Sequence, residues 1–207
     1  MVNEIYGKKI KSTQVFNDSG AAINVTAIEA EPCTIIGIKT SGNDGYDAIR
    51  VSFGKVKEKN INKPGRGIYD KMKIPVKRYI KELKLGDSKK EYKLGDKIDV
   101  GIFKVGDRVK ITGKSKGKGF SGAIKRYNFH RGPMTHGSHN IRKPGAAGMC
   151  ATPSRIHKGK KMPGRMGGRN VTIPPTEIID IIDDQNLILV KGSVPGPTGN
   201  MVLLRKA

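Results

Sequence analysis

Acidic residues are missing from a long internal stretch of this chain. The sequence has 207 residues and 18 Asp and Glu, but none of these lies between Gly113 and Thr176. The same stretch holds 14 of the 40 Lys and Arg, all four His and 12 of the 27 Gly. The net charge of +22 therefore divides into +14 for this stretch and +8 for the rest, which carries 26 basic and 18 acidic residues. Cations at this density repel one another unless a polyanion surrounds them, which predicts a nucleic-acid partner.

Cysteines and long apolar runs are also scarce. The two cysteines, Cys33 and Cys150, lie in different kinds of segment, so a disulfide stays possible but free thiols in a reducing compartment are expected. No run of 18 apolar residues occurs, which predicts that nothing spans a membrane. The N-terminus lacks an apolar signal region, and we therefore expect a soluble intracellular protein without a membrane partner.

The basic stretch has few large aliphatic side chains, and residues 113–170 contain 12 Gly and 4 Pro. Such a segment cannot build a packed core of its own, so its fold depends on a partner. The other 149 residues are numerous enough to bury a core. The sequence thus predicts a globular body made of residues 1–112 and 171–207, and a basic extension at 113–170. A loop of this length inside a compact domain is usually functional.

Outside the extension, apolar alternation and turn residues predict a mainly β protein. Two similar phrases place Gly-Asp at 95–96 and 106–107 before β-branched runs, which is typical of turns that feed the strands of a small barrel. Residues 55–92 read as a minor α+β insertion, in which Pro64 could open a short helix and 77–85 could be strand or helix. The expected fold is a small β-barrel body with this insertion and a long, mostly irregular basic extension. The other expected strands cover residues 15–16, 23–28, 33–38, 46–53, 98–100, 109–112, 178–182, 187–190 and 201–204.

Three patterns that could indicate an enzyme fail on inspection. Gly117–Gly122 fits G-x-G-x-x-G, but a dinucleotide site needs an acidic residue about twenty positions on, and the next one is Glu177. The spacing H-x2-H-x10-C-x6-H of His136, His139, Cys150 and His157 matches no common structural zinc site. A nucleophilic Cys150 would need a base and an orienting carboxylate, and no acid lies nearby. We therefore expect no catalytic residue, metal, cofactor or small-molecule substrate.

Basic residues interleaved with aromatics and glycines are the positive signal. Lys and Arg neutralise phosphates, Arg can bind them with two hydrogen bonds, glycine amides can approach closely, and aromatic rings can stack on unpaired bases. A solvated, disordered basic loop is the alternative, but this segment is internal, varied in composition and stiffened by four prolines. The predicted RNA-binding residues are Lys114, Lys116, Lys118, Lys125, Arg126, Tyr127, Phe129, Arg131, His136, His139, Arg142, Lys143, Arg155, His157, Lys158, Lys160, Lys161, Arg165 and Arg169.

Several of these motifs together resemble the bacterial-type ribosomal protein L3 family of the large subunit. The resemblance rests on residues 113–122, Lys125–Phe129, 136–138, 142–145 and above all 158–167, with further support from 43–46 and 187–196. Two positions depart from the family pattern. Gly7-Lys8-Lys9 is followed by Ile10-Lys11-Ser12 where members usually have Val-Gly-Met, and Ala151 stands where some members carry a methylated glutamine.

The resemblance implies a structural, non-enzymatic protein of the cytoplasmic ribosome. It implies a β-barrel body on the ribosome surface, and an extension that runs through ribosomal RNA toward the peptidyl transferase centre. It also implies early binding to large-subunit RNA during assembly, with the large-subunit proteins numbered fourteen and nineteen as neighbours. Residues 144–153 would form the extension tip, because 145–152 carry no charge and only small or flexible side chains. Nearest the catalytic RNA would be Gly145, Gly148, Met149, Cys150, Ala151 and Thr152.

Two other functions stay open at the level of sequence. An RNA-modifying enzyme could use the basic loop to deliver its substrate, but it should show a cofactor or metal constellation. A DNA-binding architectural protein could use the same charge, although an irregular, Gly-rich internal loop suits folded RNA better than a groove-reading helix or ribbon. Co-sedimentation with the large ribosomal subunit in high salt would support only the ribosomal function.

Overall fold

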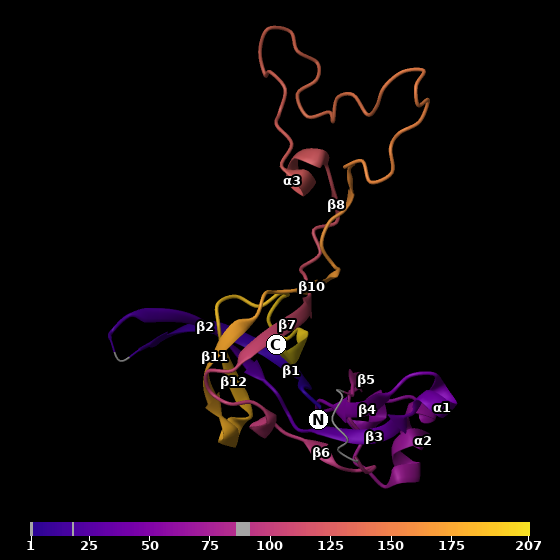
Figure 1. The fold of residues 1–207 in the computed structure, drawn as a ribbon, viewed down its shortest axis with the longest axis vertical. Coiled ribbons are helices and arrows are strands. Elements are labelled where there is room, and N and C mark those ends of the chain that lie inside the picture. Colours follow the sequence, from indigo (N-terminus) through magenta and orange to yellow (C-terminus); the bar gives the residue numbers. More distant parts are fainter. Residues whose placement is uncertain (1, 18, 86–91) are drawn as a thin grey trace. The chain divides into compact units, whose positions relative to one another are not determined.

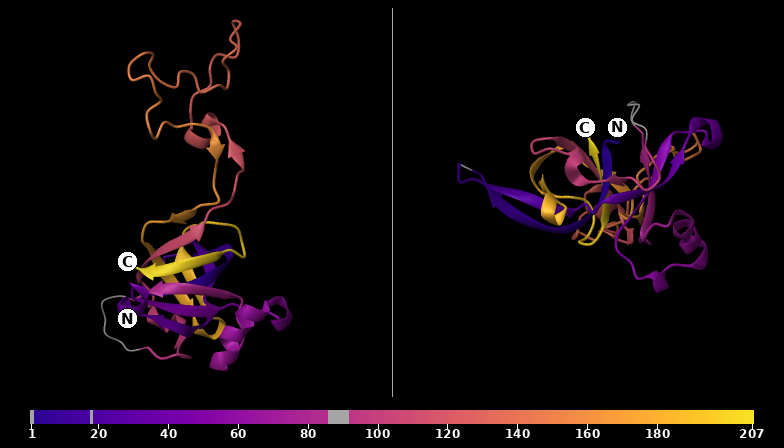
Figure 2. Two further views of the ribbon diagram at one scale, coloured as in Figure 1. Left: turned by 90° about the vertical axis from the view of Figure 1, so that its right-hand side faces the viewer. Right: turned by 90° about the horizontal axis from the view of Figure 1, so that it is seen from below.

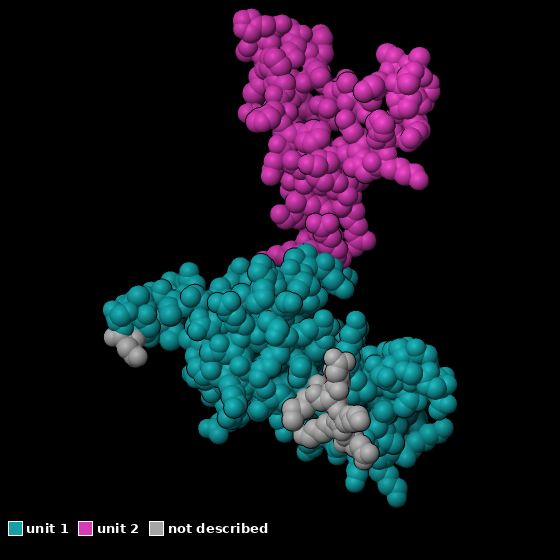
Figure 3. All heavy atoms as spheres, in the orientation of Figure 1, with its two compact units in different colours: residues 1–114, 170–207 teal, residues 115–169 magenta. Residues whose placement is uncertain are grey.

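The computed structural model describes residues 2–17, 19–85 and 92–207. The chain divides into two compact units: residues 1–114 with 170–207, and residues 115–169 (Figure 3). Among the described residues no helix combines the length and apolar character needed to cross a membrane. The two units are described separately below.

The first unit contains a closed, six-stranded β-barrel (Figures 1 and 2). Its strands run in the order β7-β11-β12-β2-β1-β13, and pairing between β13 and β7 closes the ring. The short strand β10 (Asn170–Thr172) adds to the same edge of β7 as β11. The predicted fold class, mainly β with a small barrel, is confirmed. The barrel strands are β1 (Glu4–Phe16), β2 (Ala22–Glu29), β7 (Arg108–Lys114), β11 (Thr176–Ile182), β12 (Leu187–Lys191) and β13 (Met201–Lys206).

Alternating side chains explain why these segments form strands with one buried face. In β7, Val109 and Ile111 are fully buried, while Arg108 and Lys110, which alternate with them, are exposed. A period of two puts every second side chain on the same face of a strand, so each strand contributes one apolar row to the barrel interior. The core residues with no exposed surface include Ile5, Ile28, Val109, Ile111, Ile178, Ile188, Val190 and Leu204.

A second, four-stranded sheet of the same unit has the order β5-β4-β3-β6. In the segment left undecided in the sequence, 77–85, residues 79–84 form a strand that pairs along its whole length with β4. Pro64 lies in the first turn of α2, as predicted, and this helix buries Tyr69. The elements are β3 (Cys33–Lys39), α1 (Ser41–Asp44), β4 (Ala48–Phe53), a 3₁₀ turn (Glu58–Asn60), α2 (Lys63–Met72), β5 (Tyr79–Lys84) and β6 (Lys97–Ile98).

The two Gly-Asp turns have the same structure. Gly95 and Gly106 both have positive φ, 92° and 86°. Gly95 donates its N–H to Ile35 and Ile35 donates back to Asp96, while Gly106 and Asp107 make the same pair of bonds with Ile178. The strand predicted at 98–100 is wrong at its end: β6 stops at Ile98 because residues 100–102 form a 3₁₀ turn.

Candidate nucleic-acid interface

The second unit begins as two antiparallel legs joined by backbone hydrogen bonds (Figure 1). Ser115 donates to Arg169 and Lys118 donates to Met166, with N···O distances of 2.9 Å each. Farther along, β8 (Phe120–Ser121) pairs with β9 (Gly164–Arg165). The two cationic runs that flank the expected tip, 114–131 and 155–169, are thus antiparallel where they pair. This pairing fixes which cations of one leg face those of the other.

Glycines allow the close approach of the two legs. Gly167 has a φ of +71°, and a Cβ there would overlap the carbonyl oxygen of Lys116. A Cβ on Gly164 would lie 2.7 Å from the guanidinium of Arg126. A side chain at either position would therefore push the legs apart or displace an arginine.

Helix α3 (Ala123–Tyr127) gathers cations around an aromatic pair. Arg126 donates to the carbonyl oxygen of Met162 over 2.7 Å, and its guanidinium lies 5.0 Å from the ring centroid of Tyr127. The Lys161 ammonium lies 5.8 Å from the same centroid. The ring of Phe129 lies 6.3 Å from that of Tyr127. Cations near the face of an aromatic ring are attracted to it, so this arrangement holds positive charge in defined positions without any carboxylate.

Three arginines line one cavity of this unit. The cavity has a volume of about 350 Å³ and is lined by Arg126, Tyr127, Arg165, Arg169 and residues 166–168. No Asp or Glu exists anywhere in residues 115–169 to neutralise these guanidinium groups. Guanidinium forks bind phosphate with paired, charge-assisted hydrogen bonds. The cavity is therefore suited to an anion such as an RNA phosphate.

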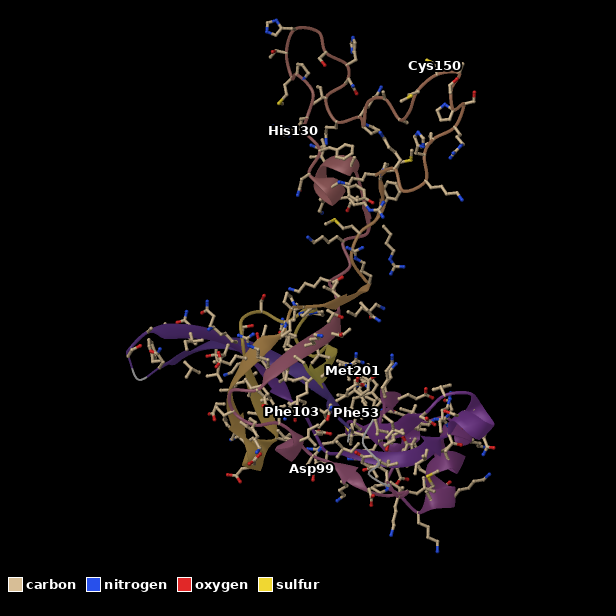
Figure 4. The ribbon with its side chains drawn as sticks, viewed as in Figure 1. Phe53, Asp99, Phe103, His130, Cys150 and Met201 are labelled. Carbon is tan, nitrogen blue, oxygen red and sulfur yellow. The ribbon has the colours of Figure 1, made fainter. Side chains whose placement is uncertain are left out.

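Beyond α3 the chain forms two lobes, the first made of residues 128–141 and the second of residues 142–163, and none of these residues is buried. The first lobe is closed by a bond from the N–H of Gly132 to the carbonyl of Ile141, and it contains His136 and His139. Figure 4 shows Cys150 in the second lobe, well separated from His130 at the start of the first. Residues 145–152 are all exposed, and Met149 is 74% exposed. In the whole unit only Ser121 and Ala123 are buried, so hydrogen bonds rather than a core hold it together.

The family model for ribosomal protein L3 matches residues 89–207, which is more than half of the chain. The chain belongs to the ribosomal protein L3 family. As an L3-family member it is a structural, non-enzymatic protein of the large subunit of the cytoplasmic ribosome, and its partners are large-subunit RNA and ribosomal proteins. The match includes the entire second unit and strands β7 and β10–β13.

In this L3-family chain the predicted RNA-binding residues are distributed unevenly. Arg126, Tyr127, Arg165 and Arg169 come together around one cavity, and Lys161 joins them through the ring of Tyr127. The histidines do not gather with Cys150: among the described residues no three His, Cys, Asp or Glu side chains form a group that could hold a metal. Phe120 is missing from the predicted set although it is 80% exposed beside Lys118, and its place among lysines and glycines was the signal for it.

The two remaining sequence motifs have clear structural outcomes. Gly117–Gly122 contains the two-residue strand β8 and is followed by the five-residue helix α3, and elements this short do not build the βαβ unit of a dinucleotide site. Both cysteines are free, Cys33 in the core and Cys150 exposed. Burial raises the pKa of the Cys33 thiol to about 12, which keeps it protonated and inert at neutral pH.

Proposed function

We propose that this L3-family protein binds large-subunit ribosomal RNA through its basic extension, helps nucleate subunit assembly and braces RNA near the peptidyl transferase centre. The observation that carries the proposal is a 55-residue unit, Ser115–Arg169, with two buried residues and no acidic side chain. Such a unit gains its order from contacts with a polyanion, because it has neither an apolar core nor internal ion pairs. The functional division is the body, 1–112 and 171–207, and the RNA-penetrating extension, 113–170.

Contacts to RNA would fall into three groups within the extension. The cavity of Arg126, Arg165 and Arg169 would hold phosphate, and Tyr127 and Phe129 would stack on or beside bases. The histidines and basic residues of the lobes would donate to phosphate and sugar oxygens. Large-subunit proteins fourteen and nineteen are the proposed protein neighbours of the body. The remaining proposed contacts are Lys114, Lys116, Lys118, Lys125, Arg131, His136, His139, Arg142, Lys143, Arg155, His157, Lys158, Lys160 and Lys161.

The salt dependence of binding to transcribed large-subunit RNA tests this function. If six to ten of the extension's cations contact phosphates, affinity falls by roughly 10³–10⁵ between 50 and 200 mM salt. Replacing Arg126, Arg165 and Arg169 together by Gln should weaken binding and reduce the slope of log K against log salt by about three. The matched control replaces three exposed cations of the body, Lys97, Lys110 and Lys191, by Gln. A nearly flat salt dependence of the unaltered protein would refute the proposal.

The second lobe is proposed as the tip near the peptidyl transferase centre, where Gly145, Gly148, Met149, Cys150, Ala151 and Thr152 would meet RNA. A Cβ on Gly148 meets nothing closer than 3.7 Å, so the free protein tolerates a side chain there. Gly148→Trp should therefore leave thermal stability unchanged but alter late subunit maturation or sensitivity to peptidyl-transferase inhibitors. Thr135→Trp, at an exposed site of the first lobe, is the control. An effect of Thr135→Trp alone would place the tip in the first lobe instead.

A further inference from the structure

The excess positive charge of the body is confined to one segment. Residues 55–81 contain ten Lys and Arg and two acidic residues, Glu58 and Asp70, which gives this segment a net charge of +8. The body outside it carries 16 basic and 16 acidic residues and is neutral. The whole surplus of the body therefore lies between the end of β4 and the middle of β5, in the second sheet rather than the barrel.

Part of this charge lines a groove. The groove has a volume of about 890 Å³, and its charged walls are Lys55, Lys57, Lys59 and Arg78, all of them exposed. The described residues that line it include no Asp or Glu; the others are Val56, Asn60, Ile61 and Tyr79. Glu58, which lies between two of the lysines in sequence, is bound instead by Arg66 at 2.6 Å. The Glu58 carboxylate is thus paired with a cation that does not line the groove.

The backbone around the groove is held in place by the sheet and by α2. Arg78 donates its N–H to the carbonyl of Gly54 over 2.9 Å, where the chain leaves β4 and returns into β5. Gly54 has a φ of +82°, and a Cβ there would lie 3.1 Å from the ring of Tyr79. The hydroxyl of buried Tyr69 donates to the carbonyl of Lys77, which ties α2 to the entry of β5. A groove fixed in this way loses little conformational entropy when it binds.

A second, smaller cavity adjoins the groove and shares Lys55 and Tyr79 with it. Its volume is about 230 Å³, and the rings of Tyr6 and Phe53, which stack with centroids 5.1 Å apart, lie in its wall. Glu31 lines this cavity together with Lys8 and Glu29. Its Oε1 lies 3.9 Å from the Lys55 ammonium, and its Oε2 is buried without a hydrogen-bond partner among the described residues. The cavity thus offers aromatic rings and one unused acceptor beside a row of cations.

We propose that this groove is a second binding site for ribosomal RNA, independent of the extension. Phosphates would lie along Lys55, Lys57, Lys59 and Arg78, and an unstacked base would reach the aromatic cavity, where an exocyclic amino group can donate to Glu31. A nucleotide supplies both the anion and the amino-bearing ring. An acidic peptide would supply the anion but bring carboxylates against Glu31, which disfavours it. The inference rests on the proposed function only in that large-subunit RNA is the partner.

Three full-length variants distinguish the two sites. The groove variant replaces Lys55, Lys57 and Lys59 by Gln, the extension variant replaces Arg126, Arg165 and Arg169 by Gln, and the control replaces Lys97, Lys110 and Lys191 by Gln. Each is titrated with transcribed large-subunit RNA at several salt concentrations, and its melting temperature is measured. The groove variant should reduce the salt slope by about two to three without a lower melting temperature, and the control should not. Ultraviolet crosslinking of the unaltered protein should attach RNA to a peptide containing residues 55–59 or Tyr79.

The outcomes separate the failure of one site from that of the other. If the groove variant has the salt slope and RNA affinity of the control while the extension variant binds RNA more weakly, the groove site is overturned and the proposed function stands. If the extension variant binds RNA like the control and the groove variant binds it more weakly, the proposed role of the extension is overturned and the groove site stands. A groove variant that binds RNA like the control but no longer binds a polyglutamate peptide or anionic vesicles would assign the groove to another class of partner and overturn the inference.

Discussion

At the scale of single residues, glycine decides how closely the two legs of the extension approach. Gly167 and Gly137 have similar positive φ values, +71° and +68°, but only Gly167 has a backbone carbonyl where a Cβ would go. Substitution by Ala costs roughly 1–2 kcal/mol of backbone strain at either position. At Gly167 the overlap with Lys116 adds to this cost.

Gly167→Ala should therefore open the pairing of the legs, whereas Gly137→Ala should not. Amide exchange of Ser115, Lys118 and Met166 in the RNA-bound protein measures the opening, because these amides donate across the legs. Affinity for ribosomal RNA should fall more for Gly167→Ala than for Gly137→Ala. Equal effects of the two variants would show that strain alone, and not leg contact, matters at this position.

The residue scale also shows where sequence reasoning reached its limit in the candidate site. The cations of the extension could be predicted from composition, because the absence of Asp and Glu over this stretch is visible in the sequence. The meeting of Arg126 with Arg165 and Arg169 could not be predicted, because it depends on backbone hydrogen bonds between residues far apart in the sequence, such as Ser115 and Arg169. The groove at residues 55–59 was missed because its charge was averaged over a body whose other charges cancel.

At the scale of elements, the two Gly-Asp turns dock on a strand in the same way but differ in one ion pair. Asp107 accepts the N–H of Lys104 over 2.9 Å and pairs with the Lys206 ammonium at 2.7 Å. Asp96 accepts the N–H of Lys93 over 2.9 Å, and within the described residues it has no ion-pair partner. The Lys206 ammonium, and to a lesser extent the Lys104 amide, lower the pKa of Asp107 below its ordinary value.

This lowered pKa predicts a pH-dependent contribution to stability. Because the pKa of Asp107 is lower in the folded than in the unfolded protein, its contribution is complete above the unfolded value and is lost as pH falls through the folded one. Asp107→Asn should lower the melting temperature slightly at neutral pH, and the difference from the unaltered protein should shrink and vanish as pH falls through the lowered pKa of Asp107. Asp96→Asn is the control and should show a smaller difference at neutral pH. A difference for Asp107→Asn that persists unchanged in acid would contradict the ion-pair explanation.

Elements with one buried face could be predicted from the sequence, and others could not. The hairpin of β11 and β12 and the closing strand β13 lie where alternation and turn residues put them. Strand β5 stayed undecided because Leu83 is its only fully buried side chain, so its sequence carries little periodicity. Pairing with β4 determines that it is a strand, and pairing partners are not visible in a local window.

At the scale of the whole molecule, the two units should differ in their protection from solvent. The barrel amides are bonded across a closed ring and surround a core, whereas the extension beyond α3 has neither. In the free protein we expect slow amide exchange in β1, β7 and β13 and fast exchange throughout residues 130–165. Addition of large-subunit RNA should slow amide exchange in residues 130–165. Strong protection of 130–165 without RNA would contradict this expectation.

The order of strands in the barrel has a consequence for the protein during its own synthesis. Strand β13 is made last, yet it pairs with β1, which is made first, and with β7. At roughly 5–20 residues per second, synthesis of the stretch from β1 to β13 takes roughly 10–40 s. Until β13 is made, β1 and β7 both lack it as a neighbour, although the extension at 113–170 has already been synthesised. If the extension binds RNA as proposed, it becomes available for binding before the barrel can close, and early capture of the extension would then compete with folding of the body.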